Sequence, residues 1–174
     1  AAAAGAPAAR AELDSLGAAV LIGGSAHPIC EGLFFVSGVA PRGLGSDLCG
    51  DKRAEERYLA CRIKGAGTVV ISACSHAGVV NVCADAMARL GRDLGAVVGG
   101  LHLCGGSVAE EELIQRTVEG LKVMRPDVVL AGHCTGWRAK AALLQGFGDA
   151  FQPLAVGGRY IFSPPPLWNL VCRL

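Results

Sequence analysis

The chain has 174 residues and a formal net charge of +1, and 52% of its residues are hydrophobic. That length suits one ordinary domain with a buried core, and no apolar stretch is long enough to predict a membrane span. The 16 Lys and Arg residues are scattered without a basic stripe, so we expect neither nucleic acid nor a membrane as a partner.

The first ten residues, AAAAGAPAAR, contain too few large apolar groups to form a core. We therefore predict a disordered or low-complexity leader over residues 1–10. Because they include no initiator Met, secretory signal or transit pattern, we interpret this start as a low-complexity leader or an incomplete chain. We predict one domain over residues 11–162 and a Pro-rich tail over residues 163–174.

The body of the chain predicts alternating strands and helices. Before residue 68 we expect a short helical end, two strands, a loop and a further strand, at Ala11–Leu16, Ala18–Ile22, Gly32–Gly38, Ala40–Lys52 and Glu55–Ile63. Periodicity does not decide whether the last of these is a strand or a helix, but its alternation favours a strand.

From residue 68 onwards the hydrophobic pattern is more regular. It predicts strands at Thr68–Ser72, Ala96–Gly99 and Val128–Ala131, and helices at Val79–Leu90, Val108–Val123 and Trp137–Leu144. The first of these strands lacks polar alternation, which is typical of a central strand that is buried on both faces. We expect Phe151–Phe162 to form a hairpin around Gly157 and Gly158. Together the elements predict an α/β layered fold with the strands inside.

The eight cysteines do not indicate a disulfide scaffold. Five of them lie in strand-like or helix-like text or beside motif histidines: Cys61, Cys74, Cys83, Cys104 and Cys134. We expect reduced thiols in a reducing compartment, the cytoplasm first and an organelle second. No C-x-x-C pair supports a cysteine-rich structural zinc site.

Three of the four histidines occupy equivalent places in the sequence. His76 follows VVISACS, His102 follows AVVGGL and His133 follows VVLAG. If these strands share a sheet, their ends bring the three imidazoles to one edge, where they predict a site for zinc or another first-row metal, such as iron or manganese. The alternative is that each imidazole satisfies a buried carbonyl group. His27 precedes Pro28 in irregular text, and we expect it to be a surface residue.

Other motifs contribute less. Cys74, Cys104 and Cys134 lie within two residues of the three motif histidines. Each could bind a metal or act as a nucleophile, but small residues at strand ends serve equally well as packing, so we assign them no role. The glycine-rich stretches match neither a P-loop nor a dinucleotide fingerprint, and no G-x-S-x-G elbow indicates a serine hydrolase.

Five sequence stretches carry a resemblance to a known family. They are CSHAGVVN at Cys74–Asn81, VVGGLHL at Val97–Leu103, GHCTGWRA at Gly132–Ala139, FFVSGVAPR at Phe34–Arg42 and FGDAFQPLAVG at Phe147–Gly157. With these motifs the chain resembles the C-terminal half of a metallo-β-lactamase-fold protein. The branch it resembles is that of the dihydropterin-ribofuranosylaminobenzene phosphate synthases.

The resemblance implies half of an αββα sandwich with a metal site, often dinuclear, at one edge of the sheets. It implies that His76 is the ligand of the family's third metal motif and His133 that of the last, while His102 stands where many members have a bridging aspartate. Glu55 and Glu56 fall near an acidic pair that is typical of the branch, and we assign them no role.

The chain departs from the family because no two of its histidines have the spacing of a histidine-x-histidine-x-aspartate-histidine motif. Two interpretations follow. The first is a metal-dependent hydrolase or pterin-type synthase that acts on phosphoryl or carboxyl esters of a small molecule with one or two ions. The second is a non-catalytic remnant or a small-molecule or metal-binding module. A half-fold also exposes a sheet face, which predicts self-association.

Overall fold

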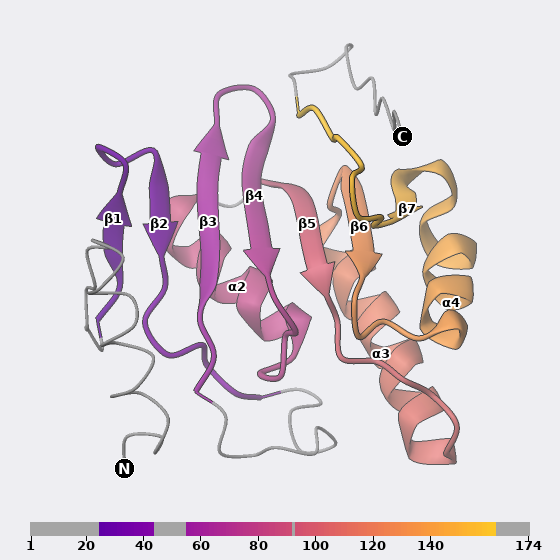
Figure 1. Cartoon of the computed structure of the whole chain (residues 1–174). Coiled ribbons are helices and arrows are strands. Elements are labelled where there is room, and N and C mark those ends of the chain that lie inside the picture. Colours follow the sequence, from indigo (N-terminus) through magenta and orange to yellow (C-terminus); the bar gives the residue numbers. More distant parts are fainter. Residues whose placement is uncertain (1–24, 44–54, 92, 163–174) are drawn as a thin grey trace.

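The computed structural model describes residues 25–43, 55–91 and 93–162. They form a seven-stranded sheet whose strands follow each other in chain order (Figure 1). The strands are β1 (His27–Ile29), β2 (Phe34–Val36), β3 (Tyr58–Ile63), β4 (Gly67–Ser72), β5 (Leu94–Gly100), β6 (Val128–Gly132) and β7 (Phe151–Pro153). The predicted elements Ala11–Leu16 and Ala18–Ile22, the leader, the tail and most of the predicted loop Ala40–Lys52 lie outside the described residues.

The sheet changes from antiparallel to parallel at β4. β1, β2, β3 and β4 pair in this order and each pair is antiparallel, whereas β4, β5, β6 and β7 run parallel. Parallel neighbours need crossover connections, and the three helices between these strands provide them. They are α2 (Val79–Leu90), α3 (Val108–Met124) and α4 (Trp137–Phe147), and the short 3-10 turn Gly148–Ala150 follows α4.

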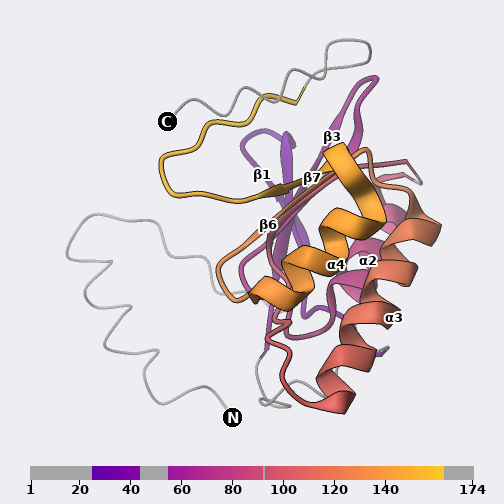
Figure 2. The same cartoon turned by 90° about the vertical axis from the view of Figure 1, so that its right-hand side faces the viewer.

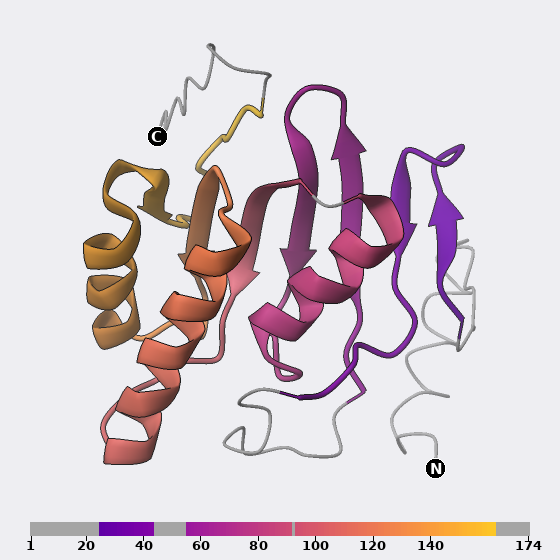
Figure 3. The same cartoon turned by 180° about the vertical axis from the view of Figure 1, so that it is seen from behind.

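All three helices cover the same face of the sheet (Figures 2 and 3). This confirms the predicted α/β layered fold, with one sheet and one helical layer, which is half of an αββα sandwich. The strand and helix types expected between residues 55 and 147 are also confirmed, and their ends differ by a few residues. None of the described helices is long and apolar enough to cross a membrane.

The central strand β4 has a buried side chain on each face. Val70 belongs to the main core between sheet and helices, together with buried residues of α2 and α3. Val69 belongs to a smaller cluster on the opposite face, where Leu154 of the C-terminal segment packs. Ile71 is 36% exposed, so burial of β4 is incomplete towards its end. The self-association expected from an exposed sheet face stays a prediction.

Two expectations near the ends of the chain are wrong. His27 does not lie in irregular text but in β1, where it is half-buried, and Pro28 is part of the same strand. Proline is tolerated there because β1 is an edge strand of the sheet and needs fewer backbone donors.

The predicted hairpin over Phe151–Phe162 does not form. The crossover through α4 returns the chain parallel to β6, so β7 pairs with β6 and not with the residues that follow it. Residues 154–162 contain no strand. The Tyr160 hydroxyl instead holds this segment, because it donates to the Pro153 carbonyl at 3.3 Å and accepts from the Ala155 N–H at 3.2 Å.

A polar cluster ties α2 to β3 and makes stability depend on pH. Tyr58 and Arg89 donate to the Asp85 carboxylate at 2.6 and 2.9 Å. Burial alone would raise the pKa of Asp85, but the hydrogen bonds from Arg89 and Tyr58 outweigh it and hold the pKa below its ordinary value. Burial and the Asp85 carboxylate raise the pKa of Tyr58, so its hydroxyl stays protonated as a donor.

We expect Asp85→Asn to lower the free energy of unfolding at pH 7 by roughly 1 kcal/mol. The side chain is only 17% exposed, and its two hydrogen bonds lose the negative charge of their acceptor. A depressed folded pKa contributes stability above the unfolded pKa of about 4, and this is lost as pH falls through the folded pKa. Urea unfolding at a series of pH values should therefore show the two proteins converging at low pH. Asp93→Asn is the control, because Asp93 also pairs with an arginine but its side chain is 80% exposed. A constant difference down to the lowest pH would contradict this prediction.

Candidate metal site at the ends of three parallel strands

The candidate site lies where β4, β5 and β6 end. Because these strands are parallel, the chain leaves each of them at the same edge of the sheet. His76, His102 and His133 follow within four residues of the last strand residue in each case. The structure thus places the three predicted histidines on one edge.

The backbone turns sharply at this edge. Ser75, His102 and His133 have φ values of 58°, 49° and 52°, a left-handed conformation that is unfavourable for residues other than glycine. Hydrogen bonds hold two of these turns, since Ser75 Oγ donates to the Gly100 carbonyl at 2.7 Å and Thr135 Oγ1 accepts from the Leu101 N–H at 3.1 Å. Strain that is held in place in this manner is common at functional sites.

His76 and His102 form a first group with Cys74. The two imidazole centroids are 4.5 Å apart, and the possible ligand atoms of all three residues lie within 4.8 Å of one another. His102 Nδ1 is buried and has no hydrogen-bond partner among the described residues. Burial, and then the neighbouring His76, lower the pKa of His102, which favours the neutral imidazole that metals bind.

Glu56 holds the ring of His76. Its carboxylate is 8% exposed, and Oε1 lies 3.4 Å from His76 Nδ1 while Oε2 accepts from the Ala77 N–H at 3.1 Å. In the tautomer that carries its proton on Nδ1, the ring would direct this proton to the carboxylate and leave the Nε2 lone pair for a ligand. A carboxylate behind a histidine is a common arrangement around metal-binding imidazoles, where it fixes the tautomer and the ring.

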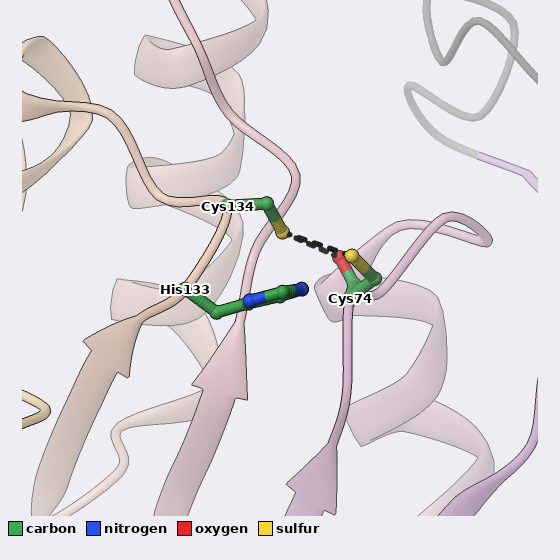
Figure 4. Close-up of side chains that lie close together, drawn as sticks. All are labelled: Cys74, His133 and Cys134. Carbon is green, nitrogen blue, oxygen red and sulfur yellow. Dashed lines mark hydrogen bonds between the residues drawn. The ribbon is translucent and has the colours of Figure 1, made fainter. Parts of the chain in front are cut away.

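His133 belongs to a second group, with Cys74 and Cys134 (Figure 4). The Sγ atoms of the two cysteines are 3.1 Å apart, and Cys134 Sγ lies 3.6 Å from the Cys74 carbonyl oxygen. The His102 backbone N–H donates to Cys134 Sγ at 3.2 Å. Cys74 is common to both groups, so the two lie side by side.

The structure divides the predicted ligands between two groups. Among the described residues, His76 and His102 lie together, and His133 lies with two cysteines. His27 and the exposed Cys104 belong to neither group.

Sequence reasoning assigned no role to three residues that the structure places at this edge: Cys74, Cys134 and Glu56. For the cysteines a signal was present, since each is within two residues of a motif histidine. It did not distinguish a ligand from a packing residue. For Glu56 the signal was the acidic pair typical of the resembled branch. It did not indicate that this carboxylate lies beside His76, which is 20 positions further along the chain.

Two hollows lie near the site. One of about 20 Å³ is lined by His76, His102 and apolar residues of α2 and α3, and it is too small for a substrate. The other, of about 620 Å³, lies at the start of α3 between Ser107, Glu111 and Arg138 and contains none of the candidate ligands. Its volume is that of a small-molecule pocket.

The residues at the edge fit a metal ion. Imidazole nitrogen and thiol sulfur are the donors that zinc and similar first-row metals prefer. A buried ring nitrogen without a partner is costly unless something binds it, and His102 Nδ1 is such an atom. The unpartnered nitrogen and the set of donor atoms therefore both fit a bound metal ion.

Comparisons with known proteins find similarity in sequence and in structure. No protein-family model matches the sequence. A "7,8-dihydropterin-6-methyl-4-(beta-D-ribofuranosyl)-aminobenzene-5'-phosphate synthase" from Methanocaldococcus jannaschii is 33% identical over 92 residues, which are 52% of this chain and 30% of that protein. A solved structure of a metal-dependent hydrolase of the β-lactamase superfamily is also similar, with a TM-score of 0.63 and 24% sequence identity. The match covers 84% of this chain and 59% of the chain in that structure. The chain spans less than two thirds of either protein.

Proposed function

We propose that this chain, which has the fold of the metallo-β-lactamase superfamily, carries the metal-binding part of a metal-dependent hydrolase or pterin-type synthase. Its substrate would be a phosphoryl or carboxyl ester of a small molecule. We assign His76, His102 and His133 as ligands of one or two divalent ions, zinc first and iron or manganese as alternatives. The observation that carries the proposal is the buried, unpartnered Nδ1 of His102 beside His76 and Cys74.

A divalent metal ion held here would act as a Lewis acid that lowers the pKa of water and polarises the ester oxygen. The protein's own part is to hold the ligands in place. Glu56 fixes the ring and proton of His76. The hydroxyls of Ser75 and Thr135 bind the neighbouring strand ends, which keeps the three histidine turns in register.

A non-catalytic metal-binding module is the second candidate. It is favoured by the hollow that His76 and His102 line, whose volume of about 20 Å³ is too small for a substrate. The two candidates differ in turnover. The metal-loaded chain should hydrolyse simple phosphodiester or carboxyl ester substrates if the first is right, whereas tight metal binding without turnover favours the second.

Metal analysis of the purified chain tests the proposal. We expect at least one zinc, iron or manganese ion per chain by inductively coupled plasma mass spectrometry. We expect its loss when His76 and His133 are both replaced by Ala. His27→Ala is the matched control, because His27 lies in β1 and in neither ligand group. A folded wild-type chain that stays metal-free after incubation with these ions would refute the proposal.

A further inference from the structure

We propose that Cys74, His133 and Cys134 form a thiolate-containing metal subsite for a thiophilic divalent ion such as Zn²⁺. The inference rests on the proposed function in placing a metal at this edge of the sheet. It goes further by assigning the two cysteines as ligands and by separating His133 from the His76 and His102 group.

The three donor atoms come together from strands that are not neighbours. Cys74 follows β4, whereas His133 and Cys134 follow β6, and β5 lies between them. Their possible ligand atoms nevertheless lie within 4.8 Å of one another, and Figure 4 shows the imidazole of His133 directed towards the cysteines. The three side chains therefore meet over the end of β5.

Gly100, at the end of β5, leaves the space in which they meet. A Cβ atom at this position would lie 2.5 Å from the Ala73 carbonyl oxygen, 2.7 Å from Cys134 Sγ and 3.2 Å from His133 Cδ2. All three contacts are closer than ordinary van der Waals separation. The absence of a side chain at Gly100 therefore allows the second group to assemble over the end of the middle strand.

The surroundings also suit sulfur that carries negative charge. The His102 backbone N–H donates to Cys134 Sγ at 3.2 Å, and such a bond strengthens when the sulfur is a thiolate. One divalent ion that binds both thiols displaces their two protons, so the charges of the ion and the two thiolates cancel. Two thiolates and one imidazole leave one tetrahedral position open, as in zinc sites that act on substrates.

Cobalt substitution provides a direct test, because Co²⁺ bound to thiolate gives a charge-transfer absorption in the near ultraviolet that imidazole ligands do not give. The wild-type chain, kept reduced with a phosphine, should show this band on titration with Co²⁺. Cys134→Ser should lose about half of the band, since one of two thiolate ligands is gone. Cys104→Ser, at an exposed cysteine outside both groups, should keep all of it.

His76→Ala separates this inference from the proposed function. If that variant keeps the charge-transfer band, the thiolate subsite stands independently of the His76 group. Cobalt binding by the wild type without the band, or an equal loss in Cys134→Ser and Cys104→Ser, would overturn the subsite and leave the proposed function intact. A folded wild type that binds no cobalt would overturn both.

Discussion

Replacing Gly99 with Ala is expected to unfold the sheet edge that carries the site. Gly99 pairs with Ser72 between β4 and β5, and a Cβ atom there would overlap the Ser72 carbonyl oxygen. Its φ of 133° is also one that residues with side chains rarely adopt. Because the obstacle is backbone and not a flexible side chain, β4 and β5 would have to separate. We expect a loss of about 4 kcal/mol or more in the free energy of unfolding.

Gly106→Ala is the matched control. Its φ of 128° is similar, but the nearest atom to an added Cβ, a carboxylate oxygen of Glu110, is 3.8 Å away. This variant bears only the backbone strain, roughly 1–2 kcal/mol. Urea unfolding of both variants measures the difference, which is the contribution of the close approach of β4 and β5. Equal losses in the two variants would contradict the packing of Gly99 against Ser72.

Replacing Glu56 with Ala is expected to weaken metal binding about 10- to 100-fold without removing a ligand. The carboxylate lies 3.4 Å from His76 Nδ1, so its loss frees the ring to rotate and removes the partner that fixes the proton on Nδ1. The Ala77 N–H also loses its acceptor, which loosens the turn that carries His76. Competition with a chromophoric chelator measures the affinity.

Two variants at this position refine the test. Glu56→Gln keeps an oxygen that can accept from the Ala77 N–H but lacks the negative charge, and we expect an affinity between those of the wild type and Glu56→Ala. Glu55→Ala removes the exposed neighbouring carboxylate and should bind metal as the wild type does. If Glu55→Ala and Glu56→Ala weaken binding equally, Glu56 acts through general charge and not by positioning His76.

Much of the fold could be predicted because local patterns and tertiary packing agree. The helix at Val79–Leu90 has the bounds expected from its apolar spacing. The start of α3 was predicted at Val108, and the structure shows why: Ser107 and Glu110 form a capping box there. Gly157 and Gly158 do lie in a turn, but no hairpin forms there. Strand pairing depends on where the crossover through α4 places β7, and this is beside β6.

The sequence by itself determined that His76, His102 and His133 each follow a buried strand, because a strand pattern and the residue that ends it are local properties. The sequence also contains the motifs that carry the family resemblance, and the structural match supports the fold that this resemblance implies. Only the tertiary structure decided how these residues group, because grouping depends on contacts between segments far apart in the chain. It joined His76 to His102 and Glu56, and it brought His133 and Cys134 to Cys74 across the gap that Gly100 leaves.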